Sequence, residues 1–297
     1  MTDAAASPGL RARLLIDCSD RPGIVAAVSG LLARHGGNIV ESDQHSTGAA
    51  DGHFFMRMVV DLDAGPTETP EAAAERLRAS FAVEVAGRFG MRWRLTLVQN
   101  RPRIAVLASR EPHALMEMLW RWQRDELGGA DIAFVVSNHP DHRGVVERFG
   151  LNYHHVPATR ANREEAEDAI LALLDGACDV VVLARYMQIL TGGFLGRVGL
   201  PVINIHHSFL PAFAGAEPYR RASDRGVKIV GATAHYVTEE LDAGPIIEQD
   251  VVRVDHRSSV PDMVRLGADV ERMVLGRAVR WHAEDKVIEH GGKTVVF

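Results

Sequence analysis

Apolar residues change their spacing several times along the first hundred positions. Over 24–32 they recur at helical intervals, directly after the turn-forming residues 20–23, and Gly36 and Gly37 end this predicted helix. The Gly- and Ala-rich residues 47–52 predict a hairpin connection between two strands. Taken in order, strands are expected at 14–16, 38–45, 53–60 and 92–98, and helices at 24–32 and 69–81. This βαββαβ order predicts an open sheet with helices on one face.

The spacing of apolar residues changes after a short linker at 99–103, where proline and charged residues interrupt the apolar pattern. Nearly unbroken, β-branched apolar runs follow, at 104–108, 132–136 and 180–184, and helical spacing separates them, around 115–126 and 163–174. Continuous apolarity indicates strands covered on both faces, so a mostly parallel, Rossmann-like α/β sheet is expected. We therefore predict an α/β protein of two domains, 10–99 and 103–297. In such sheets ligands bind beyond the carboxyl ends of the strands.

One predicted strand ends in a cluster of polar residues, within the sequence VINIHHSFLPAF at 202–213. Asn204 and His206 are two residues apart, so on an extended segment their side chains leave the same face. His207 should point to the other face, where we expect a supporting role. A histidine beside a strand end is often only a hydrogen-bonded structural residue, so this cluster alone does not define a function.

Composition narrows the range of partners. The 297 residues carry a formal net charge of −6 and no run rich in Lys and Arg, which argues against a nucleic-acid partner. The first nine residues lack the pattern of a signal peptide, and no apolar stretch reaches membrane-spanning length, so a cytoplasmic protein is expected. Cys18 and Cys178 lie far apart without metal-ligand spacing, so we expect two buried thiols, no disulfide and no zinc.

Three motifs occur in order in the second predicted domain: VINIHHSFLP at 202–211, GATAHYV at 231–237 and LDAGPII at 241–247. With them the chain resembles, over nearly its full length, the formyltetrahydrofolate deformylases, in which a ferredoxin-like ACT domain precedes a folate-dependent formyltransferase fold. The resemblance implies hydrolysis of 10-formyltetrahydrofolate to formate and tetrahydrofolate, which supplies formate for purine synthesis and balances one-carbon pools. It implies no metal and no permanently bound cofactor.

The same resemblance assigns functional residues by position. Asn204, His206 and Asp242 match the catalytic asparagine, histidine and aspartate of these enzymes, and His235 matches a supporting histidine. The segment after the strand at 180–184 matches the folate pocket, with Arg185, Met187, Gln188, Ile189 and Leu190. Apolar side chains with backbone polar groups suit a flat heterocycle, although core packing explains the three apolar residues of this segment almost as well.

The three catalytic candidates fit the chemistry of deformylation. Asn204 can donate an amide N–H to the oxyanion that forms when a carbonyl is attacked. His206 can share that oxyanion and deliver a proton toward N10, while Asp242 can orient the attacking water, relay its proton and keep His206 charged. Asp242 lies in a Gly-Pro loop, where we expect an exposed carboxylate, and a turn-capping role is its alternative. Ser208 lacks the G-x-S-x-G context of a serine hydrolase.

The first turn of the parallel sheet favours water over an amine as the acceptor. Ribonucleotide transferases of the fold that this chain resembles hold a phosphate there on a loop rich in Gly and Ser. Residues 108–113 instead read ASREPH, without glycine and with the acidic Glu111, although Arg110 could meet an anion such as the folate tail. Formyl transfer to an amine such as glycinamide ribonucleotide stays the alternative. Glu217 departs from the neutral or basic residue usual in the family, which leaves the contacts of its loop open.

The N-terminal sequence DRPGI at 20–24 resembles the ACT signature, in which the turn before the first helix binds an amino-acid effector. Asp20, Arg21, Pro22 and Gly23 are therefore the effector-binding candidates, since glycine permits the bend and helix N–H groups favour a carboxylate. A purely structural domain that drives oligomerisation is the alternative. We expect a homo-oligomer, a dimer or a tetramer, in either case. The intact set of catalytic candidates argues against a non-catalytic amino-acid-binding protein.

Overall fold

The computed structural model describes residues 10–48, 52–63, 68–212 and 218–297, which form two compact units. The first unit extends to Asn100 and includes Asp285–Ile288 and Val295–Phe297, and the second comprises Arg101–Glu284 and Glu289–Thr294. The described residues leave out three segments that the predictions concern: the nine N-terminal residues, part of the predicted hairpin connection 47–52, and Glu217.

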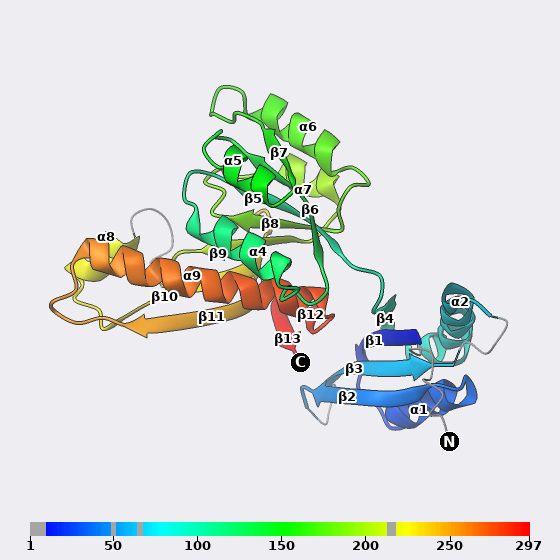
Figure 1. The fold of residues 1–297 in the computed structure, drawn as a ribbon. Helices are drawn as coiled ribbons and strands as arrows, with labels where there is room; N and C mark the ends of the chain where they lie inside the picture. Colours follow the sequence, from blue (N-terminus) through cyan, green and yellow to red (C-terminus); the bar gives the residue numbers. More distant parts are fainter. Residues whose placement is uncertain (1–9, 49–51, 64–67, 213–217) are drawn as a thin grey trace, which may run out of the picture. The chain divides into compact units, whose positions relative to one another are not determined.

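The first unit holds a four-stranded antiparallel sheet in the order β2-β3-β1-β4 (Figure 1). Its elements are β1 (Leu10–Ser19), α1 (Ile24–Arg34), β2 (Asn38–Ser46), β3 (His53–Leu62), α2 (Pro70–Phe81), η1 (Ala82–Ala86), α3 (Gly87–Phe89) and β4 (Arg92–Leu97). The order of strands and helices is as predicted, and the second helix continues through the π-helical turn η1 to Phe89. Thr69 caps α2, because its side chain accepts a hydrogen bond from the backbone N–H of Ala72.

The strand β1 buries apolar residues on both faces where the sequence reads Leu14, Leu15, Ile16, although the second face is otherwise mostly polar. Leu14 and Ile16 lie in the core with apolar residues of α1 and α2. Leu15 belongs to a separate apolar cluster, where residues of the C-terminus, among them Ile288 and Phe297, pack against it. These C-terminal residues fall within the range expected for the second domain, but they pack in the first unit. There they cover Leu15 and Phe55, the apolar side chains on the second face of its sheet.

The second unit holds a seven-stranded sheet in the order β11-β10-β9-β8-β5-β6-β7, parallel from β9 to β7. Its elements are β5 (Arg103–Ala108), α4 (His113–Gln123), β6 (Asp131–Ser137), α5 (Arg143–Arg148), β7 (Asn152–His155), α6 (Arg163–Leu174), β8 (Val180–Ala184), α7 (Gly192–Val198), β9 (Val202–His206), α8 (Pro218–Asp224), β10 (Ile229–Tyr236), β11 (Ile246–Arg253) and α9 (Val260–Ala283). Among the described strands, only β10 pairs antiparallel with its neighbours, β9 and β11, so the sheet is mostly parallel, as predicted. The short strands β12 (Val287–His290) and β13 (Lys293–Val296) pair near the C-terminus.

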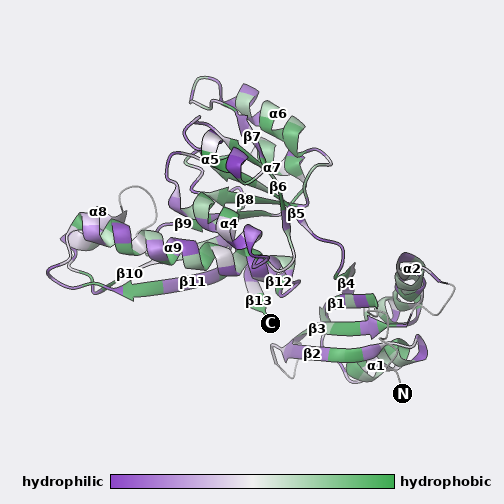
Figure 2. Ribbon diagram, viewed as in Figure 1, coloured by the Kyte–Doolittle hydropathy of each residue, from purple (hydrophilic) through white to green (hydrophobic). Residues whose placement is uncertain are grey.

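Helices cover the long sheet closely. Side chains of α6 and α7 pack in one core with β5, β6 and β8, while α9 contacts β9, β10 and β11. All five residues of β8 are buried, as the unbroken apolar run predicted, and apolar residues follow the central strands in Figure 2. Cys18 and Cys178 are both buried, as predicted. Among the described residues, no helix combines the length and apolarity that crossing a membrane requires.

The strand order places a crevice at the carboxyl edge of the long sheet. From β5 the chain moves outward to β6 and β7 and then returns to β8 on the other side of β5, and ligands bind at such switch points. Ser109, just after β5, donates to Oδ1 of Asn138 at 2.6 Å and accepts from the backbone N–H of Met187 at 3.0 Å. The turn after β5 is thereby tied to the segment after β8, which carries the folate-pocket candidates.

Candidate active site

The strand β9 presents two of the catalytic candidates on one face. Asn204 and His206 alternate with the buried Ile205, as extended backbone requires. The neighbouring strand β10 places His235 opposite Asn204 and Thr233 opposite His206. Residues directly opposite each other in an antiparallel pair lie on the same face, so His235 joins the two candidates.

His235 orients Asn204 through a fixed ring tautomer. Its Nδ1 lies 2.9 Å from the carbonyl oxygen of Tyr236, which can only accept, so Nδ1 carries the proton. Nε2 of the neutral ring is then an acceptor, and it lies 3.3 Å from Nδ2 of Asn204. Burial lowers the pKa of His235, which favours the neutral ring. One amide hydrogen of Asn204 therefore points to His235, and the second is left for another acceptor.

Asp242 reaches the same place from the turn between β10 and β11. Its backbone is left-handed, with φ 56°, a conformation that aspartate tolerates better than most residues. Gly244 lets this turn approach β10, because a Cβ at this position would lie 1.8 Å from the carbonyl oxygen of Tyr236. The expectation of an exposed carboxylate was wrong: the side chain is 12% exposed, because it packs against His206 and His235.

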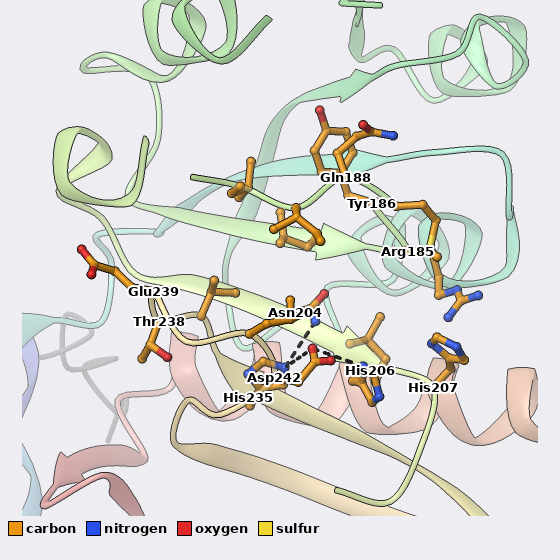
Figure 3. Close-up of a pocket in the computed structure, with 17 residues that line it drawn as sticks. Arg185, Tyr186, Gln188, Asn204, His206, His207, His235, Thr238, Glu239 and Asp242 are labelled. Atoms are coloured by element: carbon orange, nitrogen blue, oxygen red, sulfur yellow. Dashed lines mark hydrogen bonds and ion pairs between the residues drawn. The ribbon is translucent and has the colours of Figure 1, made fainter. Parts of the chain in front are cut away.

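The four polar side chains converge (Figure 3). Oδ1 of Asp242 lies 3.3 Å from Nδ1 of His206 and 3.9 Å from Nε2 of His235. The hydrogen bond from His206 holds the pKa of Asp242 below its usual value, against the opposing effect of burial. The other nitrogen of His206, Nε2, is buried and has no hydrogen-bond partner among the described residues. Leaving such a nitrogen unpaired costs about 1–3 kcal/mol, a cost that calls for a functional explanation.

These side chains form one wall of a cavity of about 340 Å³ at the carboxyl ends of β8 and β9. All five folate-pocket candidates also line this cavity: Arg185, Met187, Gln188, Ile189 and Leu190. Met187 and Ile189 are 56% and 58% exposed, and Leu241, beside Asp242, is 60% exposed. Large apolar side chains exposed around a cavity suit a flat, largely apolar ligand.

Sequence reasoning missed a buried carboxylate beside this cavity. Glu271 of α9 is 2% exposed. Its Oε2 lies 2.8 Å from Nε2 of His113 and 3.4 Å from Nε of Arg185, and its Oε1 accepts from the hydroxyl of Tyr219 at 3.1 Å. Burial acts to raise the pKa of Glu271, but the hydrogen bond from His113 and the charge of Arg185 hold it below its usual value. A signal existed, since Glu271 stands on the apolar stripe of α9 that includes Val274.

His207 lies one residue beyond β9, where strand alternation no longer governs its side chain. Although expected on the other face, it lines the same cavity as His206, with the two ring centroids 5.0 Å apart. Burial lowers the pKa of His207 to about 4, and the positive charges of Arg185 and His206 act in the same direction. His207 is therefore neutral at pH 7.

The four effector candidates line one surface cavity in the first unit. Asp20, Arg21, Pro22 and Gly23 surround it together with the first residues of α1 and with Phe54, and its volume is about 570 Å³. The helix α1 begins after Gly23, whose φ is 94° and which supplies no side-chain cap. Since the first N–H groups of a helix have no partner within the helix, α1 can offer them to an anion.

Comparison with known proteins agrees with both units. Residues 102–279 match the formyl transferase family, and residues 12–80 match the ACT domain. The formyltetrahydrofolate deformylase of Mycobacterium tuberculosis is 55% identical over 285 residues, which cover 96% of this chain and 90% of the relative. The crystal structure of a formyltetrahydrofolate deformylase from Pseudomonas syringae aligns with a TM-score of 0.90 at 51% identity, covering 97% of this chain and 95% of that one. Glycinamide ribonucleotide transformylase 1 from Symbiobacterium toebii aligns with a TM-score of 0.62 at 31% identity, covering 69% of this chain and 98% of that one.

The fold and the site thus define a protein in which an ACT domain precedes a formyl transferase domain, as the sequence predicted. The chain belongs to the formyltetrahydrofolate deformylase family.

Proposed function

We propose that the protein is a hydrolase that converts 10-formyltetrahydrofolate to formate and tetrahydrofolate. One observation carries the proposal: the side chains of Asn204, His206, His235 and Asp242 converge in a cavity that is otherwise largely apolar. Hydrolysis of a formyl group requires an oxyanion donor, a proton donor and a base around one carbon atom, and this set supplies them. Membership of the family supports the same cleavage of a C–N bond.

Each polar side chain takes one part of the proposed reaction. Water adds to the formyl carbon, and the second amide hydrogen of Asn204 stabilises the oxyanion. Asp242, ionised because its pKa is held low, orients the water and accepts its proton. His206, paired through Nδ1 with Asp242, delivers a proton to N10 as the C–N bond breaks. His235 stays neutral and keeps Asn204 in place.

The folate ring system would lie against the segment after β8. Met187 and Ile189 offer exposed apolar surface there, and Gln188 adds a polar side chain. No bound cofactor and no metal enter this scheme.

Formyl transfer to an amine is the second candidate function, favoured by the similarity of the second unit to a ribonucleotide transformylase. The turn at 108–113 disfavours this transfer, because the turn contains no glycine to bring backbone N–H groups to the phosphate of the acceptor. The hydroxyl of Ser109 in this turn is already engaged with Asn138 and Met187.

Incubation of the purified protein with 10-formyltetrahydrofolate, with and without glycinamide ribonucleotide, tests the proposal. We expect the same rate of formate release in both reactions, with one tetrahydrofolate formed for each formate. An Asn204→Ala variant should lose about a hundred- to a thousandfold in kcat, because one oxyanion donor is gone. Turnover that requires the ribonucleotide would contradict hydrolysis.

For the first unit we propose a regulatory role, in which an amino acid places its carboxylate on the N–H groups of α1 beside Asp20, Arg21, Pro22 and Gly23. Calorimetric titration with the common amino acids tests this binding. We also propose a cytoplasmic homo-oligomer, a dimer or a tetramer, whose released formate supplies purine synthesis and whose turnover balances one-carbon pools.

A further inference from the structure

A second cavity of about 340 Å³ adjoins the candidate active site. Arg185 and His207 line both cavities, so these two side chains form the partition between them, and they lie side by side in Figure 3. The second cavity also contains the carboxylates of Glu111 and the buried Glu271. A second substrate that approached the formyl group from this side would have to pass the partition.

The backbone of Arg185 is unusual for so large a residue. It is left-handed, with φ 61°, directly after β8. This conformation costs about 1–2 kcal/mol and persists only where the surroundings hold the residue in place. Here Glu271 holds it, since Nε of Arg185 lies 3.4 Å from Oε2 of Glu271 and the two side chains are only 13% and 3% exposed.

The carboxylate of Glu271 is fully engaged. His113 and Arg185 contact its Oε2, and the hydroxyl of Tyr219 donates to its Oε1. Without Arg185, the buried carboxylate of Glu271 in the adjoining cavity would attract a protonated amine. With Arg185 in place, that charge is paired and the guanidinium at the partition repels such an amine, whereas uncharged water is not repelled.

We propose that Arg185 is a specificity-determining residue that reserves the formyl group for water, an inference that rests on the proposed hydrolysis. Its guanidinium occupies the acceptor side of the site and neutralises Glu271. In hydrolysis the water oxygen bonds to the formyl carbon, the bond to N10 breaks, N10 takes a proton, and formate leaves with release of one proton. When a primary amine replaces water, its ammonium form first releases one proton to solvent, and the free amine nitrogen bonds to the same carbon and loses a second proton. The bond to N10 breaks, N10 takes a proton, and a formamide leaves with the same tetrahydrofolate.

Competition between water and glycinamide tests the inference. Wild type, Arg185→Gly and Arg185→Lys are incubated with 10-formyltetrahydrofolate and glycinamide, and the ratio of N-formylglycinamide to formate is measured. Glycine adopts the left-handed backbone without strain, so Arg185→Gly removes the side chain alone. We expect the ratio to rise at least about tenfold in Arg185→Gly and to stay within about threefold of wild type in Arg185→Lys, which keeps the charge.

The ratio compares two products of the same active molecules, so it does not depend on the fraction of protein that folds. A double variant, Arg185→Gly with Glu271→Gln, leaves no uncompensated buried charge and should also exceed the wild-type ratio. Formate release by the wild type, with a ratio that stays at the wild-type value in both glycine variants, would overturn the inference alone. Absence of formate from the wild type would refute the proposed hydrolysis, and the inference with it.

Discussion

One candidate site of this chain is built from side chains, and the other is built from backbone N–H groups. In the second unit, side chains from β9, β10 and the turn before β11 meet, and Nε2 of His206 has no partner in the part of the chain that the structure describes. In the first unit, polar side chains of the turn at 20–23 are engaged with other segments of the same unit: Asp20 accepts from Ser46, and Arg21 donates to the carbonyl oxygen of Arg88. What that turn leaves available is the backbone N–H groups of α1.

This difference decides which substitutions affect each site. A site made of side chains loses its function when one functional group is replaced, even if the backbone stays in place. A site made of backbone groups tolerates changes of side chain but depends on its dihedral angles, which only a few residues permit.

Replacement of Asp242 by Asn should have the largest effect on the side-chain site. The variant keeps the shape of the residue but removes the carboxylate that pairs with Nδ1 of His206. We expect kcat to fall about a hundred- to ten-thousandfold, the range for loss of a general acid or base, which corresponds to about 3–5 kcal/mol in the barrier. Steady-state hydrolysis of 10-formyltetrahydrofolate measures it, with thermal melting to confirm the fold.

Glu240→Gln provides the matched control for this prediction. Glu240 is an exposed acidic residue two positions earlier in the same turn, and it does not line the cavity. Loss of one carboxylate from this position should leave kcat within about twofold, since surface charges here act through solvent. If Asp242→Asn were as active as Glu240→Gln, Asp242 would have no part in the mechanism.

The same contrast explains what the sequence could and could not predict. The runs at 104–108, 132–136 and 180–184 coincide closely with β5, β6 and β8, because strands covered on both faces are apolar throughout. The strand β7, with the sequence NYHH, was not predicted, since it lies at the edge of the sheet and carries no such run. Edge strands have fewer side chains to bury, so their composition is weakly constrained.

The candidate site was predictable only in part. Asn204 and His206 are two residues apart on one strand, so their common face followed from extended geometry. The burial of Asp242 and the position of His207 did not, because a left-handed turn and a strand end set them. Glu271 belongs to a helix far along the chain, and its three partners come from separate segments that only the fold brings together.

The variant His207→Gln tests whether the side-chain site excludes water, through the pH dependence of the unfolding free energy. Burial lowers the pKa of His207 to about 4 from an ordinary value of 6.5. Between these pH values the unfolded chain binds a proton that the folded protein does not, so this histidine destabilises the fold as pH falls below 6.5. From pH 7.5 to 5.5 the wild type should lose about 1 kcal/mol of unfolding free energy relative to the variant, as measured by urea denaturation.

His256→Gln is the control for this pH effect. His256 is exposed, so folding removes little of its hydration. The difference between wild type and His256→Gln over the same pH range therefore gives the reference for removal of a histidine that lies in solvent. A pH dependence for His207→Gln no larger than this reference would mean that His207 is open to water in solution.

Gly23→Ala addresses the backbone site. A Cβ at Gly23 would meet no atom within 4 Å, so the substitution acts through φ 94° alone. We expect a loss of about 1 kcal/mol in the unfolding free energy, together with weaker amino-acid binding in calorimetric titration, because relief of the strain turns the N–H groups of α1 away.

Gly30→Ala is the control for this prediction. Gly30 lies inside α1, seven residues after Gly23, so this variant shows the effect of adding a methyl group without strain in the backbone. Its new Cβ would have only Nη1 of Arg34 nearby, at 3.7 Å, which is ordinary contact. Alanine is the better helix former, so this variant should gain about 0.5–1 kcal/mol in unfolding free energy. The two Gly→Ala changes should thus have opposite signs. Equal effects of both on stability and on amino-acid binding would show that the turn at 20–23 does not depend on the left-handed backbone of Gly23, and the backbone site would lose its physical basis.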